Sequence, residues 1–180
     1  MTKVRPTSVL LGLFICVATA EPPKATGKDS PAILLLRDPE REHAFAAHLL
    51  AMAEREDELQ ASLKRLSGSV GLLPAQLGPK DRELLKKAEE AQAEIEAEFV
   101  EFQKNLTDSL KAQGNDRLNE LLKAVGKPEA REGTQQIRKK IQGNHSYVAM
   151  IEMAEWSKAL RGWAGKLNGP REPQSKSEKQ

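Results

Sequence analysis

The sequence predicts an all-α fold, a small bundle of three long helices and one short helix whose neighbours run antiparallel. Between Leu84 and Leu110 the apolar residues recur every three or four positions, which is the period of an α-helix. The chain of 180 residues is 39% hydrophobic and 30% charged with few aromatics, a composition typical of long helices. No second strand candidate accompanies the apolar run Ala32–Leu36, so we expect no sheet.

The first twenty residues have the order of a secretory signal peptide. A basic start with Lys3 and Arg5 precedes an apolar run over residues 9–17, and small residues close it at 18–20. The apolar run is shorter than the roughly 20 residues that a membrane-spanning helix needs. We therefore expect cleavage after Ala20 and a secreted or periplasmic protein, with an uncleaved N-terminal anchor as the alternative.

Cleavage would change the cysteine count and the charge of the chain. It would remove Cys16, the only cysteine, and with it any disulfide or Cys-based metal site. It would also remove Lys3 and Arg5, which lowers Lys plus Arg from 28 to 26, equal to the 26 Asp plus Glu. A neutral chain has no overall field that attracts nucleic acid or anionic lipid, so we expect no nucleic-acid binding and no strong membrane affinity. An exported chain of this size without disulfides fits a bacterial envelope protein best.

The predicted bundle domain spans residues 37–168 and is flanked by one segment on each side. Residues 21–36 hold prolines and a glycine and are predicted to be a flexible linker, and residues 169–180 are predicted to be a disordered tail. The first long helix is predicted to begin with Asp38 as its N-cap and to end near Ser67.

The apolar positions of this first helix follow a heptad pattern, as in coiled coils, once Glu56 is counted among them. A carboxylate buried on such a seam would need a basic partner or a raised pKa. The simpler interpretation, which we adopt here, is that the seam opens to solvent at Glu56.

The second long helix is predicted over about residues 80–113. Residues 68–79 before it contain three glycines and two prolines and are expected to form a loop that tucks its leucines against the bundle. The apolar spacing of the second helix is closer to eleven residues per three turns than to the heptad of the first. The mismatch favours a compact bundle over a long two-stranded coiled coil.

The rest of the chain supplies a short helix and the last long helix. The short helix is predicted to begin at a cap on Asp116 and to end at Gly126, followed by a polar connector over residues 129–133. The last helix is predicted over residues 134–167. Gly143 and Asn144 leave open whether this helix is broken, with Ser146 as a new cap.

The sequence contains no complete metal-binding or catalytic motif. Glu40 and His43 have the spacing of half a ferritin-like di-iron motif, but the only second copy pairs Gln142 with His145. His48 lies five residues after His43 and therefore on another helix face. The chain has no nucleophile elbow, and its glycine-rich loop lacks a phosphate-binding lysine. We expect no catalytic residues, no metal and no cofactor, and thus not an enzyme.

Two tryptophans and two asparagines are the remaining candidate sites. Trp156 and Trp163 are seven residues apart and share one face of the last helix, so they form a candidate interaction patch. We favour packing in the core as the interpretation, because the chain has few other large residues to fill its interior. Asn105 and Asn144 each open an Asn-x-Ser/Thr triplet, an N-glycosylation acceptor only if the host is eukaryotic.

These observations predict a non-catalytic exported helical-bundle protein that binds another protein, in an envelope interaction or a holdase-like role. The alternative is an amphipathic-helix binder of lipids or membrane surfaces. Such a protein resembles the exchangeable apolipoproteins, which also lack cysteine and use Pro-punctuated amphipathic helices. A ferritin-like metal protein is the third hypothesis.

Overall fold

The computed structural model describes residues 37–69 and 72–170, in which five α-helices and no strand occur. The predicted signal peptide, the linker at 21–36 and residues 171–180 of the predicted tail lie outside the described residues. No helix in the described part of the chain is long and apolar enough to cross a bilayer. The helices are α2 (Asp38–Leu63), α3 (Pro79–Ala112), α4 (Asp116–Val125), α5 (Pro128–Gln142) and α6 (Ser146–Asn168), and the 3-10 turns η1 (Lys64–Ser69) and η2 (Pro74–Gln76) join α2 to α3.

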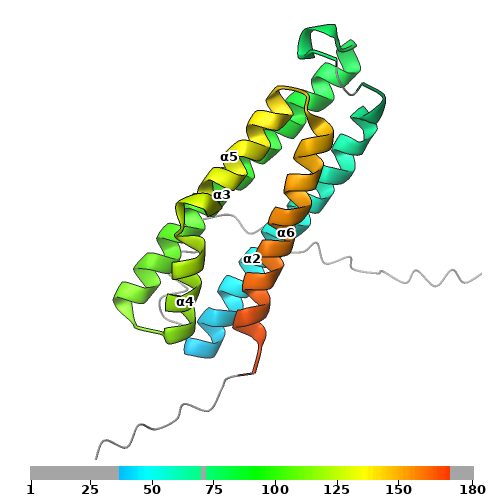
Figure 1. Cartoon of the computed structure of the whole chain (residues 1–180). Coiled ribbons are helices and arrows are strands. Elements are labelled where there is room, and N and C mark those ends of the chain that lie inside the picture. The colour runs from blue at the N-terminus through cyan, green and yellow to red at the C-terminus, as the bar shows by residue number, and fades with distance from the viewer. Residues whose placement is uncertain (1–36, 70–71, 171–180) are drawn as a thin grey trace, which may run out of the picture.

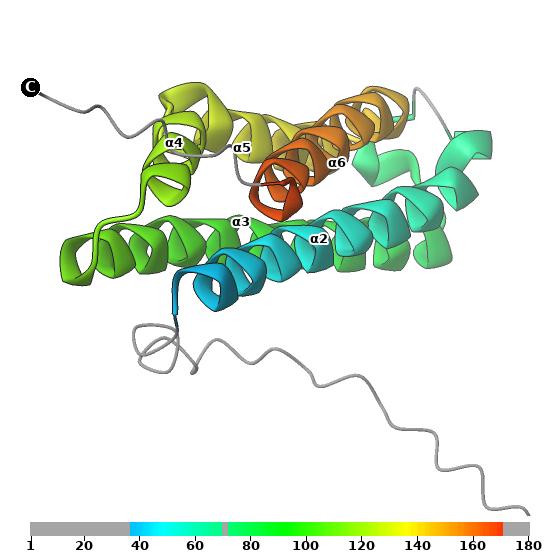
Figure 2. The same ribbon diagram turned by 90° about the horizontal axis from the view of Figure 1, so that it is seen from below.

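The helices form an antiparallel bundle of four columns, as Figure 1 shows. The helices α2, α3 and α6 each form one column, and α4 followed by α5 runs back along α3. The view in Figure 2 shows α6 lying beside α2, so that the last helix closes the bundle. The predicted all-α bundle is confirmed, whereas the prediction of three long helices and one short helix is not, because five helices are present among the described residues.

The additional helix arises from a break at residues 143–145. Asn144 has a φ of 55°, in the left-handed region through which an α-helix does not continue. Its buried side chain donates to the Leu72 carbonyl at 2.9 Å and accepts from the Ser146 hydroxyl at 3.0 Å. These contacts fix a sharp turn, after which α6 runs antiparallel to α5. Ser146 is therefore the first residue of α6 and not its cap.

The predicted polar connector at residues 129–133 is wrong, because α5 already begins at Pro128. Proline suits the first turn, where its missing N–H would have no helical partner. Ala130 is buried against the bundle, and Gly133 alone does not stop the helix.

Two predicted caps move by one residue. Asp38 is the first residue of α2, and Arg37 precedes it as the N-cap. Asp116 is likewise the first residue of α4, and the side chain of Asn115 caps this helix by accepting from the Leu118 N–H at 2.9 Å.

The core lies between the four columns and contains the periodic positions of the sequence. Apolar heptad positions of α2 and most of the apolar stripe of α3 are buried. Buried alanines occur in both α2 and α6, which pack against each other. From the predicted loop, Leu77 joins the core, but Leu72 and Leu73 are exposed, contrary to the expectation that the loop tucks its leucines in. Here the backbone carbonyl of Leu72 is held by Asn144, while the side chain points away from the core.

Replacing Gly162 by alanine is expected to raise the free energy of unfolding by about 1 kcal/mol, because glycine is disfavoured inside helices. Gly162 is an exposed residue inside α6, and a Cβ there would meet no atom within 4 Å. Urea denaturation measures the effect. Gly126→Ala is the contrasting control and should lower stability, because its Cβ would lie 2.7 Å from the Leu122 carbonyl oxygen. Equal effects of both substitutions would contradict this account.

Candidate functional site

A groove of about 410 Å³ lies between α4 and the last turns of α6. Leu121 and Leu167 are almost fully buried and form its floor with Ala124 and Trp163. Charged side chains, most of them exposed, form its rim. A concave surface with an apolar floor and a few polar groups is typical of binding sites. The rim residues are Asp116, Arg117, Glu120, Lys123, Lys127 and Lys166.

Trp163 is held in place by an aromatic cluster. Its ring stacks on Phe99 with the centroids 6.3 Å apart, and it meets Trp156 edge to face at 5.5 Å. Trp156 also packs edge to face on Phe99 at 5.0 Å and is buried. The two tryptophans therefore share one face, as their spacing predicts, but have different surroundings. Trp156 belongs to the core, whereas Trp163 is half-buried and lines the groove.

The rim of the groove is mainly cationic. Lys123 pairs with Glu120 at 2.6 Å, and Arg117 pairs with Glu42 at 3.1 Å. Within residues 37–69 and 72–170, no ion pair joins Lys127 or Lys166 to a carboxylate. Both lysines are exposed, so they can accept an incoming anionic group beside the apolar floor.

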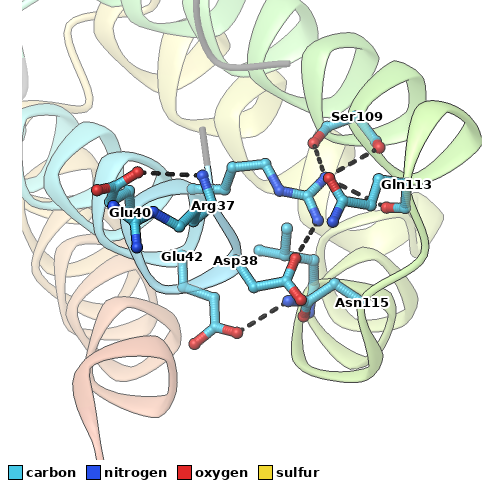
Figure 3. Close-up of polar contacts among 9 residues, drawn as sticks. Arg37, Asp38, Glu40, Glu42, Ser109, Gln113 and Asn115 are labelled. Carbon is cyan, nitrogen blue, oxygen red and sulfur yellow. Dashed lines mark hydrogen bonds and ion pairs between the residues drawn. The ribbon is translucent and has the colours of Figure 1, made fainter. Parts of the chain in front are cut away.

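A polar network fixes both walls of the groove. The Asn115 side-chain amide donates to Glu42 Oε1 at 2.9 Å, and Figure 3 shows these two side chains facing each other. Arg117 Nη1 donates to Glu42 Oε2, and its Nη2 donates to the Gly169 carbonyl at 3.0 Å. Because the last carbonyls of a helix lack intrahelical partners, Arg117 completes the end of α6 while it anchors α4.

Arg41 forms the neighbouring part of this network and is fully buried. Its Nη1 donates to the Ser109 carbonyl at 3.3 Å, the Ser109 hydroxyl at 3.1 Å and the Gln113 carbonyl at 3.2 Å. Its Nη2 pairs with Asp38. Figure 3 shows Ser109, Gln113 and Asp38 gathered at this end of the bundle. The guanidinium thus donates to Ser109 in the last turn of α3 and to Gln113, the residue that follows this helix, and it ties both to the start of α2.

Glu56 is buried, so the prediction that the seam opens to solvent there is wrong. Gln92 of α3, also buried, donates to Glu56 Oε1 at 3.0 Å and covers the carboxylate. Burial raises the pKa of Glu56 to about 7, although the hydrogen bond from Gln92 and the nearby Arg55 oppose this rise. The raised pKa that the heptad pattern would require of a buried carboxylate is therefore present.

The histidines do not come together. His43 and His145 are exposed and lie near opposite ends of the bundle, and His48 Nε2 lies 2.9 Å from Glu98 Oε1. Glu40 accepts a hydrogen bond from the Arg37 N–H at 3.0 Å, as part of the start of α2. Among the described residues, no three His, Cys, Asp or Glu side chains are placed to hold a metal ion.

The two candidate glycosylation residues differ in exposure. Asn105 is half-buried on α3, whereas Asn144 is buried in the turn between α5 and α6 and its amide nitrogen donates to Leu72. A glycan on Asn144 would have to displace this hydrogen bond.

Of the residues that line the groove, only Trp163 is a candidate that the sequence singles out. Leu121 is one apolar position of the short helix, and Lys127 directly follows the predicted end of that helix at Gly126. Leu121 and Lys127 line one groove with Lys166 because the chain turns at residues 143–145 and α6 runs back to α4.

Comparison of the chain with protein-family models, with curated proteins and with solved structures finds no match.

Proposed function

We propose that the chain is a non-catalytic, exported helical-bundle protein that binds another protein through the groove between α4 and α6. The supporting observation is the position of Trp163, half-buried on the groove floor, beside Lys127 and Lys166 on the rim. Tryptophan anchors with surrounding polar groups are typical of the residues that dominate binding energy at interfaces. The charged start, apolar run and small residues of positions 1–20 support export with cleavage after Ala20.

The partner that fits this groove is an acidic amphipathic segment of another protein. Its apolar side chains would cover Leu121, Trp163 and Leu167, and its carboxylates would pair with Lys127 and Lys166. An amphipathic helix that lays its apolar face into a groove is a common mode of peptide recognition. Charge pairing at the rim would select acidic partners over basic ones and accelerate their association.

A helical peptide with Leu on one face and Glu on the other is expected to bind the chain, as measured by calorimetry and by tryptophan fluorescence. The double variant Lys127→Glu/Lys166→Glu should bind roughly tenfold more weakly, because two attractive contacts become repulsive. The control Lys104→Glu/Lys158→Glu has the same net charge but changes exposed lysines outside the groove, and it should bind as the unchanged chain does.

Three results would contradict the proposal. They are no binding of the Glu peptide, equal binding by both double variants, and equal binding of a peptide with Lys in place of Glu. Binding of decanoate, without binding of the peptide, would instead favour the alternative function as a lipid binder.

A further inference from the structure

The end of the bundle opposite the groove carries exposed apolar side chains. It is the end where η1, η2, the start of α3 and the turn between α5 and α6 meet (Figure 1). Two of the side chains come just before η2 and three from the first turns of α6, and the most exposed are Leu73 at 64% and Tyr147 at 62%. We call them the tip patch, which consists of Leu72, Leu73, Tyr147, Val148 and Ile151.

The tip patch is held together by the fold. The hydrogen bond from Asn144 to the Leu72 carbonyl fixes the segment before η2 against the residue that leads into α6. Tyr147, Val148 and Ile151 share one face of α6, because helical residues three and four apart are neighbours. Single exposed apolar residues are ordinary on a protein surface, but five of them at one end of the bundle, on two segments joined by a hydrogen bond, indicate an interaction site.

The tip is also cationic. Exposed or half-exposed lysines and arginines occur at the ends of η1, α3 and α5 that meet there. Asp81 and Glu83 are the acidic residues of the first turns of α3, and Glu83 already pairs with Lys87 at 2.7 Å. The near-neutral total charge therefore hides a local excess of positive charge at this end. The cations are Lys64, Arg65, Lys80, Arg82, Lys139 and Lys140.

We propose that the tip docks on an anionic lipid surface, with Leu73 and Tyr147 entering the headgroup region and the surrounding cations contacting lipid phosphates. Tyrosine is enriched at the level of the headgroups because its ring is apolar and its hydroxyl is polar. Each Lys or Arg near an anionic leaflet adds electrostatic attraction, which falls off within a Debye length. Such docking is peripheral and salt-dependent. It does not rest on the proposed function, because the groove lies at the other end and stays accessible.

Co-sedimentation with phospholipid vesicles tests this proposal. The experiment uses the chain from Glu21 onward, because the apolar run at residues 9–17 would bind vesicles by itself. This chain keeps the whole bundle, since the contacts of the bundle lie between Arg37 and Gly169. We expect binding to vesicles of phosphatidylcholine with phosphatidylglycerol, loss of binding in high salt, and little binding to phosphatidylcholine alone.

Two tip variants and two matched controls make the test specific. Leu73→Ser/Tyr147→Ser is expected to lower the vesicle partition coefficient roughly tenfold, since it removes the two most exposed apolar groups. The control Leu50→Ser/Val100→Ser changes apolar residues that are 36% and 37% exposed elsewhere, and it should bind as the unchanged chain does.

Charge reversal provides the second pair of variants. Lys64→Glu/Lys139→Glu should lose vesicle binding roughly tenfold, whereas Lys127→Glu/Lys166→Glu in the groove should keep it. Circular dichroism verifies that each variant remains helical. No binding to anionic vesicles, equal binding to neutral ones, or equal loss in tip and control variants would overturn the proposal.

Discussion

Replacing Glu56 by glutamine is expected to raise the free energy of unfolding at pH 8 by about 3 kcal/mol, since each unit of pKa shift is worth about 1.4 kcal/mol. In the folded chain burial holds the pKa of this carboxyl at about 7, well above its ordinary value of 4.5. At pH 8 the folded state therefore carries a buried carboxylate whose ionisation costs stability. Glutamine removes this charge and keeps an oxygen that can accept from Gln92.

The pH dependence of this effect has a defined sign. Because the folded-state pKa of Glu56 lies above the unfolded value, the contribution to stability is fully present below about pH 4.5 and is lost as the pH rises through about 7. The glutamine variant does not show this loss. The difference in free energy of unfolding between the variant and the unchanged chain should therefore be smallest near pH 4 and largest above pH 7.

Urea denaturation over a pH series measures this difference. The control is Glu58→Gln, the same change at an exposed position of the same helix, and its effect should stay within about 0.5 kcal/mol at every pH. A gain from Glu56→Gln that is independent of pH, or that is largest under acidic conditions, would contradict the assignment of a raised pKa.

Replacing Arg41 by alanine is expected to lower the free energy of unfolding by about 3 kcal/mol, since hydrogen bonds from a charged group are worth about 1.5–3 kcal/mol and the space left by a buried side chain adds to the loss. The substitution removes the hydrogen bonds that the guanidinium donates to Ser109 and Gln113 at the end of α3. It also removes the ion pair with Asp38 and opens a space where a fully buried side chain was.

Thermal and chemical denaturation measure the effect of Arg41→Ala. Arg37→Ala is the matched control, because Arg37 is exposed and donates to Glu40 through its backbone N–H, which alanine keeps. The control should change stability by less than about 0.5 kcal/mol. A loss below 1 kcal/mol for Arg41→Ala would show that this network does not hold the end of the bundle together.

The helical periodicity of the sequence predicted the fold class because burial follows it closely. The apolar positions of α2 and α3 became the core, and even Glu56 obeyed the heptad pattern against the expectation that it would face solvent. The pattern predicts which face of a helix is buried, but it does not contain the charge state of a residue on that face. That state depends mainly on how deeply the neighbouring helices bury the carboxyl, and the hydrogen bond from Gln92 of α3 opposes the effect of burial.

The number of helices could not be predicted in the same way. Whether a helix continues through Gly143 and Asn144 depends on about 1 kcal/mol of local preference, which a tertiary contact easily outweighs. Here the decisive contact is the hydrogen bond from Asn144 to Leu72, which is distant in sequence. The same limit applies to the predicted connector at residues 129–133, where α5 has already begun at Pro128.

The candidate sites lie where ends of different helices come together, and the net charge of the chain does not reveal such local clusters of charge. A chain expected to be neutral after cleavage gave no reason to expect cationic surfaces. In the structure, Lys127 and Lys166 come together at one end of the bundle, and Lys64 and Lys139 belong to elements that meet at the other. Each pair joins residues from separate elements, so neither cluster is visible as a run of charge in the sequence.

NMR mapping of the Glu-bearing amphipathic peptide on the isotope-labelled chain tests whether the proposed groove between α4 and α6 binds an acidic partner segment. We expect the largest amide shifts on Leu121, Lys127, Trp163 and Lys166. The indole signal of Trp163 should also move more than that of the buried Trp156. Shifts that centre on Tyr147 at the opposite end, that spread over all helices, or that are absent at saturating peptide would contradict binding in the groove.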